Sequence, residues 1–167
     1  RGLGDVYKRQ VLASANHRIL ADPHAGLFVT VFYGVLDPGS GALTYANAGH
    51  NPAYLLAARG SDAIEELERT GVPLGILDGA TWQQRSVHLV PGAALMLYTD
   101  GITEAQDAQE GFFDEERLQE VARASVGLTA TEMQATVVAR VGAFVGEAPQ
   151  SDDMALVVVV RRPDETG

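Results

Sequence analysis

The stretch Ala94-Leu95-Met96-Leu97-Tyr98-Thr99-Asp100-Gly101 ends an apolar run on one acid, and Ser151-Asp152-Asp153-Met154 opens the next run, residues 155–160, on two. Both runs are short and bounded by turn residues, which predicts two buried strands. If these strands are antiparallel neighbours, Asp100 and Asp152 meet at one end of their sheet. Crowded carboxylates repel one another unless a cation or a proton joins them. Because hard divalent ions prefer oxygen ligands, the pair suggests a Mg²⁺ or Mn²⁺ site.

Composition excludes several classes of function. The 167 residues suit one domain with a substantial core. The formal net charge of −10 argues against general nucleic-acid binding and against docking on anionic membranes. The chain has no cysteine, which rules out disulfides, Cys-ligated zinc and a thiol nucleophile. No apolar run approaches transmembrane length, and a cytoplasmic location fits this composition.

The periodicity and turn signals predict an α+β fold with mainly antiparallel sheets. A Thr129–Glu132 capping box starts the second of two helices before the last strand. Hairpin turns dominate the first half, and no Gly-rich phosphate loop is present, which excludes a doubly wound nucleotide-binding fold. The expected elements are the end of a helix at 11–20, a strand buried on both faces at 27–36, strands at 42–48, 53–57, 81–90 and 93–99, a short segment at 63–67, helices at 114–124 and 129–145, and a strand at 155–160.

The first ten residues differ from the rest of the chain. Glycine, charge and a lone tyrosine alternate there without a period, so no packed element is expected in residues 1–10. We interpret them as a non-native scar, residues 11–162 as the folded domain and residues 163–167 as a polar tail.

Other polar residues have a structural and a functional interpretation. Asp-Gly after a strand is by itself a common turn. His50 and Asn51 lie in a tight loop between Gly49 and Pro52. The loop histidine either bonds the backbone or helps to place a phosphate or water near a site. Glu104 is either a supporting acid or, as we favour, part of the first turn of a helix.

Taken together, five motifs resemble the PPM-type (type 2C) metal-dependent serine/threonine protein phosphatases, in the bacterial SpoIIE-like branch. Their order and approximate spacing match over residues 11–162. The motifs are Phe28-Val29-Thr30-Val31-Phe32-Tyr33-Gly34, Leu43-Thr44-Tyr45-Ala46-Asn47-Ala48-Gly49-His50-Asn51-Pro52, Pro73-Leu74-Gly75, Leu97-Tyr98-Thr99-Asp100-Gly101-Ile102-Thr103-Glu104-Ala105 and Ser151-Asp152-Asp153-Met154-Ala155-Leu156.

The resemblance implies a sandwich of two antiparallel sheets with helices outside and a cleft that holds two Mn²⁺ or Mg²⁺ ions. It implies that Asp100 and Asp152 are metal ligands and that Gly101, Asp153, His50 and Asn51 lie near the site; no further catalytic residue is assigned. Two such metals can activate a water and neutralise phosphate oxygens, so no phosphoenzyme is needed. The substrate in this branch is usually a phosphorylated anti-sigma-factor antagonist, and sensor domains often precede the phosphatase domain.

One family motif is not matched. The family opens with Gly-Asp-Val-x-Gly-His-Gly, whereas here Gly4-Asp5-Val6 is followed by Tyr7 and no such continuation. In the family, a long helical stretch separates this motif from the segment to which Asn16 corresponds. Here only ten residues separate Asp5 from Asn16. We therefore expect an N-terminally truncated domain that by itself binds metal weakly and has little activity. Asp114 also stands where the family commonly has glycine.

Two alternatives remain. A non-catalytic regulatory module would keep the fold and bind a partner, and the unmatched acidic motif favours it. A phosphohydrolase with an aspartyl nucleophile would need a second Asp two residues from Asp100, but Tyr98 and Ile102 occupy those positions. We rank this last reading lowest.

Overall fold

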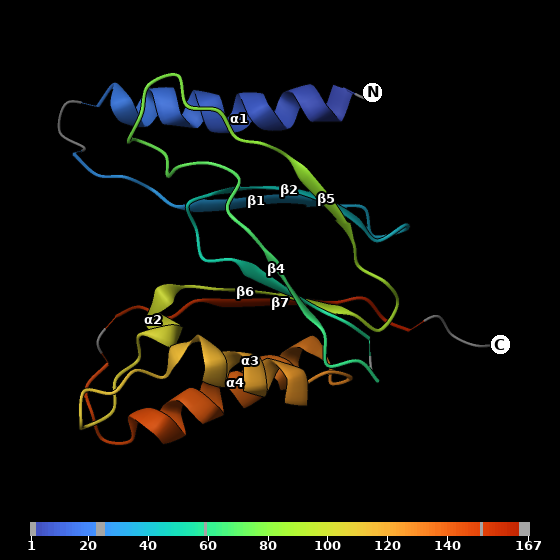
Figure 1. Cartoon of the computed structure of the whole chain (residues 1–167), viewed down its shortest axis with the longest axis vertical. Helices are drawn as coiled ribbons and strands as arrows, with labels where there is room; N and C mark the ends of the chain where they lie inside the picture. Colours follow the sequence, from blue (N-terminus) through green and yellow to red (C-terminus); the bar gives the residue numbers. More distant parts are fainter. Residues whose placement is uncertain (1–2, 23–25, 59, 151, 164–167) are drawn as a thin grey trace. The chain divides into compact units, whose positions relative to one another are not determined.

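The computed structural model describes residues 3–22, 26–58, 60–150 and 152–163, with the backbone alone for residues 3–9. The chain divides into two compact units (Figure 1). The first unit contains Arg1–Pro52 and Glu68–His88, and the second contains Ala53–Leu67 and Leu89–Gly167. Each unit has its own sheet and its own apolar core.

The first unit combines one long helix with a three-stranded antiparallel sheet. The sheet order is β1-β2-β5, and Asp37 accepts the backbone N–H of Gly39 in the β1–β2 turn. Its core joins Leu12 of the helix to Ala46, Ala48, Leu74 and Trp82. The elements are α1 (Leu3–Leu20), β1 (Val31–Leu36), β2 (Ala42–Ala48) and β5 (Arg85–His88).

The amide of Asn16 fixes α1 to the irregular segment after β2. Its Nδ2 donates to the Leu77 carbonyl at 3.0 Å, and its Oδ1 accepts the Gly75 N–H at 2.8 Å. Asn16 is buried, so both polar ends of its side chain are satisfied inside this unit.

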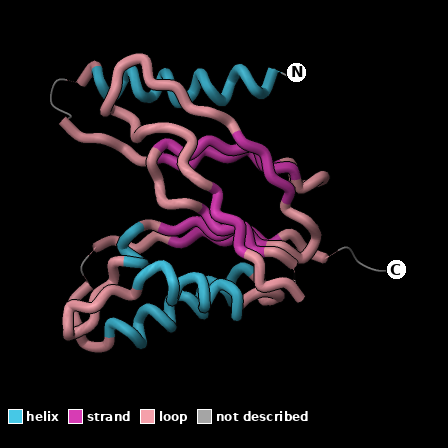
Figure 2. Tube along the Cα trace, in the orientation of Figure 1, coloured by secondary structure: helices cyan, strands magenta, loops and turns pink. Residues whose placement is uncertain are grey.

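The second unit contains a four-stranded antiparallel sheet with the strand order β4-β3-β6-β7, together with helices. Figure 2 shows strands in magenta and helices in cyan. Helices α3 and α4 pack on this sheet through a core that includes Met96, Leu118, Met133 and Val137, each fully buried. Burying each such side chain contributes roughly 1.5–3 kcal/mol. The elements are β3 (Ala53–Leu56), β4 (Ile64–Leu67), β6 (Ala94–Tyr98), α2 (Asp100–Thr103), α3 (Asp114–Ala124), α4 (Ala130–Val145) and β7 (Leu156–Val160).

The predicted α+β class with mainly antiparallel sheets is confirmed. The bounds of β2 and α3 agree with the predicted ranges, and α4 begins after Thr129 as its capping signal predicts. The glycine-like position of Asp114 also has a structural basis, because its φ of 66° lies in the left-handed region. Asp tolerates this region better than most residues, and its carboxylate accepts the Arg117 N–H at 3.0 Å.

Three expectations were wrong. The strand predicted at 27–36 starts at Val31 and is only partly buried, because β1 is an edge strand and Leu27 and Phe28 precede it in exposed positions. The strand predicted at 81–90 is confined to β5. Helix α1 extends back to Leu3, so residues 3–10 do form a regular element; their non-native origin stays a prediction. Most of the predicted polar tail, residues 164–167, lies outside the described residues.

The α4 cap yields a first prediction. The Thr129 hydroxyl accepts the Glu132 N–H, and the Glu132 carboxylate accepts the Thr129 N–H at 2.8 Å. We expect Thr129→Ala to lower the free energy of unfolding by about 1 kcal/mol in urea titrations, and Thr129→Ser to be nearly neutral. The Thr129 N–H and the Thr129 hydroxyl both donate to the Glu132 carboxylate, and these two hydrogen bonds hold the pKa of Glu132 below its usual value. The stabilisation is therefore present above about pH 4.5 and lost as the pH falls through the folded-state pKa, so the difference between Thr129→Ala and wild type should shrink in acid.

The buried tyrosine pair of the second unit, Tyr54 and Tyr98, yields a second prediction. Tyr98 donates to the Tyr54 hydroxyl at 3.0 Å, and burial raises the pKa of both phenols. A raised folded-state pKa contributes stability below the unfolded value of about 10 that is lost as the pH rises above it. Tyr98→Phe should cost about 1 kcal/mol at pH 7 and lose stability less steeply than wild type between pH 10 and 12. Parallel stability–pH curves for the two proteins in that range would contradict this assignment.

Candidate metal site

The candidate site lies at the end of the β6–β7 pair. These strands are antiparallel neighbours, and Tyr98 of β6 lies opposite Leu156 of β7. The pairing continues past the strand ends, because the Thr99 N–H donates to the Ala155 carbonyl at 3.1 Å. The segment that carries Asp100 therefore leaves the sheet beside the segment that carries Asp152 and Asp153, as the sequence pattern predicts.

Asp100 opens a single helical turn, α2, rather than a simple turn. Its carbonyl accepts the Glu104 N–H at 2.7 Å, and its Oδ1 accepts the Gly101 N–H at 3.1 Å. The Asp100 side chain is exposed. Glu104 closes this turn as its C-cap, so the expectation that it lies in the first turn of a helix is wrong.

The second acidic segment is ordered by local hydrogen bonds. The Asp152 Oδ1 accepts the Asp153 N–H at 2.7 Å, and the Gln150 amide donates to the Asp152 carbonyl at the same distance. Both carboxylates are exposed. Each acid thus keeps oxygen lone pairs available to solvent or to a cation.

Gly101 lets the two segments approach closely. A Cβ built on Gly101 would lie 2.3 Å from the Asp153 carbonyl oxygen and 3.0 Å from its carbonyl carbon. Such distances are sterically forbidden, so only glycine permits this approach without a backbone shift. Gly101 therefore lies against the Asp153 backbone, and the role of both residues near a metal site stays a prediction.

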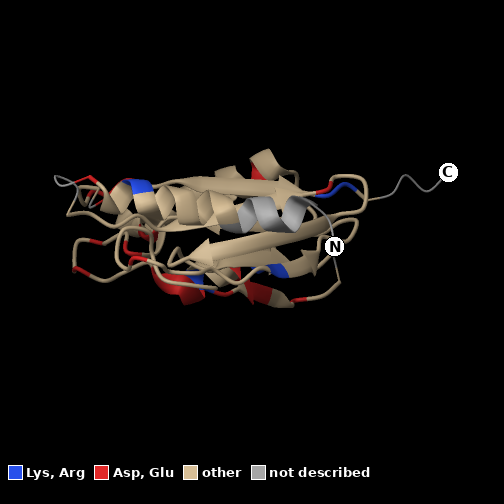
Figure 3. Ribbon diagram, turned by 90° about the horizontal axis from the view of Figure 1, so that it is seen from above, with Lys and Arg blue, Asp and Glu red and all other residues tan. Residues whose placement is uncertain are grey.

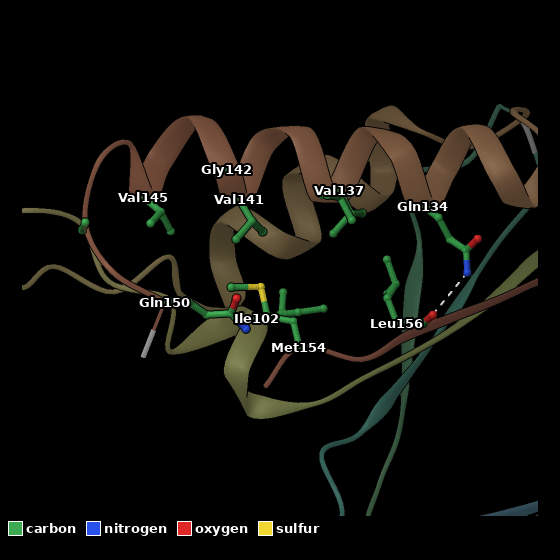
Figure 4. A pocket seen from close by; sticks show the side chains of 11 residues that line it. Ile102, Gln134, Val137, Val141, Gly142, Val145, Gln150, Met154 and Leu156 are labelled. Atoms are coloured by element: carbon green, nitrogen blue, oxygen red, sulfur yellow. Dashed lines mark hydrogen bonds between the residues drawn. The ribbon is translucent and has the colours of Figure 1, made fainter. Parts of the chain in front are cut away.

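An apolar groove of about 540 Å³ runs along α4 next to these segments. Figure 4 shows Ile102 and Met154 at its floor, each two residues after one of the acids, with Val141 of α4 facing them. Gln134 of α4 donates to the Leu156 carbonyl at 3.2 Å along the same groove. Ile102 thus places the Asp100 segment next to α4, and Met154 does the same for the Asp152 segment.

The electrostatics of the site fit a cation. The chain carries 22 Asp and Glu against 12 Lys and Arg. Figure 3 shows acidic residues in red and basic residues in blue. In the described residues, Asp100, Asp152 and Asp153 form no ion pair; the one found there joins Arg117 to Asp114. Ionised carboxylates accept hydrogen bonds only and are the oxygen ligands that Mg²⁺ and Mn²⁺ take. Within the same described ranges, no group of three or more His, Asp or Glu side chains is placed to hold a metal, and the assignment of Asp100 and Asp152 as metal ligands stays a prediction.

His50 and Asn51 belong to the first unit. The His50 N–H donates to the Asn47 side chain at 2.8 Å, and its Nδ1 lies 3.2 Å from the Thr30 hydroxyl. Gly49 adopts a φ of 73°, and a Cβ there would lie 2.4 Å from the Pro73 ring. These contacts explain the conformation of the loop, and the placement of His50 and Asn51 near the metal site stays a prediction.

Sequence reasoning missed Thr99. Its hydroxyl accepts the Ala155 N–H at 2.9 Å and donates to the Asp153 carbonyl at 3.3 Å. The available signal was a hydroxyl residue at the last position before the acid, where it reaches across an antiparallel pair.

No helix in the described ranges is long and apolar enough to span a membrane.

Comparison with known proteins gives a consistent result. The model of the family described as Stage II sporulation protein E (SpoIIE) matches residues 5–162. The chain is 33% identical over 135 residues to Protein IcfG of Synechocystis, covering 81% of this chain and 21% of that protein. It is 30% identical over 128 residues to the phosphoserine phosphatase RsbU of Bacillus subtilis, covering 77% and 38%. The chain therefore spans between about a fifth and two fifths of these relatives.

Solved structures share the fold. The SiaA-PP2C domain of Pseudomonas aeruginosa superposes with a TM-score of 0.72 at 23% identity, over 90% of this chain and 59% of that one. The phosphatase domain of SpoIIE from Bacillus subtilis, from a Mn-presoaked crystal, gives a TM-score of 0.61 at 20% identity, over 83% and 58%. At these identities the likeness concerns the fold alone.

The close approach at Gly101 is directly testable. We expect Gly101→Ala to lower the free energy of unfolding by about 1–3 kcal/mol, because the new methyl group must displace the Asp153 backbone. Gly142→Ala in α4 is the matched control, since its Cβ meets nothing within 4 Å; it should be neutral or stabilise by up to about 1 kcal/mol. Equal unfolding free energies for Gly101→Ala and wild type would show that the two segments are not in contact.

Proposed function

The chain belongs to the SpoIIE family, and on that premise we propose that its parent protein hydrolyses phosphoserine or phosphothreonine on a protein substrate with two Mn²⁺ or Mg²⁺ ions. The observation that carries the proposal is the β6–β7 pairing, which brings Asp100 beside Asp152 and Asp153. The naming of RsbU as a phosphoserine phosphatase supports the reaction class. The Mn-presoaked SpoIIE structure supports the choice of metal.

Asp100 and Asp152 would hold the metals, with Gly101 and Asp153 shaping the backbone beside them. When bound, two such ions supply an activated water and neutralise the phosphate oxygens during in-line attack. The two carboxylates bind and orient the ions, and the Gly101 approach fixes the separation of the segments that carry them. The absence of cysteine from the sequence agrees with direct attack by water.

The proposed substrate is a phosphorylated anti-sigma-factor antagonist, in a cytoplasmic partner-switching pathway. The antagonist is what the SpoIIE-like motifs imply, and the name of RsbU, a phosphoserine phosphatase, supports the phosphoserine group. Sensor domains would adjoin the phosphatase domain in the parent protein. Such a substrate would present its phosphoserine or phosphothreonine on a small protein.

The second candidate is a non-catalytic regulatory module that keeps the fold and binds a partner. What favours it is the unmatched acidic motif, together with the finding that no group of three or more His, Asp or Glu side chains among the described residues is placed to hold a metal. The two candidates differ in what Mn²⁺ does: it is required for turnover in the first and irrelevant to binding in the second.

Metal binding tests the assignment of ligands. Titration of this chain with Mn²⁺, followed by the electron paramagnetic resonance of the free ion, should detect weak binding, because two carboxylates cover part of a six-oxygen shell. Asp100→Asn and Asp152→Asn should each weaken it by about tenfold or more. The control is Glu120→Gln, which removes an exposed carboxylate of α3 and should change nothing. Binding that is equal in all four proteins would contradict the assignment.

Activity is tested on the parent protein. Hydrolysis of a phosphoserine protein substrate should require Mn²⁺ or Mg²⁺ and fall about a hundredfold or more in Asp100→Asn, because the metals supply several kcal/mol of transition-state stabilisation. This chain alone should turn over little. Metal-independent hydrolysis by the parent would overturn the mechanism, and full metal-dependent activity in this chain would overturn the expectation of inactivity.

A further inference from the structure

Thr99 occupies the N-cap position of α2 without capping it. A threonine at this position usually accepts a backbone N–H from the first turn of its own helix. Here its backbone is extended, with φ −92° and ψ 158°, and no side-chain capping bond forms. The orientation of its hydroxyl therefore serves another purpose than helix formation.

Instead, the Thr99 hydroxyl forms its hydrogen bonds across the β6–β7 pair. It accepts the Ala155 N–H at 2.9 Å and donates to the Asp153 carbonyl at 3.3 Å. Together with the Thr99 N–H bond to the Ala155 carbonyl, one residue makes three hydrogen bonds to the segment that follows Asp152. A hydroxyl can donate and accept at the same time, which a methyl group cannot.

These bonds lie between the two proposed metal ligands. Thr99 is bonded covalently to Asp100, and the two residues that its hydroxyl contacts, Asp153 and Ala155, lie one and three residues after Asp152. A shift of either segment relative to the other must break at least one of the three bonds. The Thr99 side chain thus fixes the separation of the two acid-bearing segments, although Thr99 is not itself a proposed metal ligand.

We propose that Thr99 is a positioning residue, whose hydroxyl fixes the spacing of the Asp100 and Asp152 segments and thereby their joint affinity for a divalent cation. The proposal rests on the proposed metal-binding function of these two acids. Groups that orient metal ligands without touching the metal typically change affinity by about 10–100-fold when removed. The acids themselves are exposed, so their geometry depends on such backbone anchors rather than on packing around the carboxylates.

Thr99→Val and Thr99→Ser separate this role from a general loss of stability. Valine keeps the branched shape and removes both side-chain bonds, whereas serine keeps them. Mn²⁺ affinity should fall about tenfold in Thr99→Val and stay near wild type in Thr99→Ser. Thr136→Val is the control: it removes a threonine hydroxyl bonded within α4, to the Glu132 carbonyl, and should leave Mn²⁺ affinity unchanged.

Amide hydrogen exchange tests the hydrogen bonding of the Thr99 hydroxyl in the absence of metal. In Thr99→Val the Ala155 amide loses its acceptor, so its exchange should accelerate about tenfold or more. The Arg161 amide, bonded to the Ala93 carbonyl at the far end of the same strand pair, should exchange as in wild type. Unchanged exchange at Ala155 would overturn the proposal, as would equal acceleration at both amides, which indicates general loosening.

The outcomes distinguish the two proposals. If Asp100→Asn weakens Mn²⁺ binding and Thr99→Val does not, the positioning role is overturned and the proposed metal site stands. If neither variant changes Mn²⁺ affinity, the proposed metal site fails and the positioning role with it. Weakened binding in Thr99→Val, with rescue in Thr99→Ser and faster exchange confined to Ala155, supports the proposal.

Discussion

The antiparallel pairing of β6 with β7 is the constraint on which the candidate site depends. The two strands are about sixty residues apart in the chain, and their register places Tyr98 opposite Leu156. In an antiparallel pair, the C-terminal end of one strand lies beside the N-terminal end of its partner. The acid that follows β6 and the acids that precede β7 must therefore lie at the same end of the sheet. A shift of one residue would turn the strand's side chains to the opposite face, so the buried face that includes Tyr98 also fixes the site.

The apolar core and the polar contacts cooperate in holding this register. Met96 and Tyr98 bury one face of β6 against α3 and α4, and Tyr98 finds its hydrogen-bond partner in Tyr54. Beyond the strand end there is no sheet to continue the pattern, and there the Thr99 hydroxyl and the bare backbone of Gly101 maintain the approach. Stability and site geometry therefore originate in adjacent residues of one strand and turn.

Much of this arrangement could be predicted from the sequence, where local signals were strong. The capping box at Thr129 predicts the start of α4, the apolar runs predict strands β6 and β7, and the structure agrees. The length and burial of β1 could not be predicted, because they depend on which strand lies at the sheet edge. The roles of Thr99 and Gly101 required the pairing register, since their partners are distant in sequence.

The central claim is that Asp100 and Asp152 share a divalent cation. Paramagnetic broadening of the backbone amide signals by Mn²⁺ tests it most directly, since the effect falls steeply with distance from the ion. Sub-stoichiometric Mn²⁺ should broaden the amides of Gly101 and Asp153 first, and Asp100→Asn should abolish that selectivity. Broadening that begins elsewhere, for example around the exposed acids of α3, while Gly101 and Asp153 stay sharp, would contradict the account.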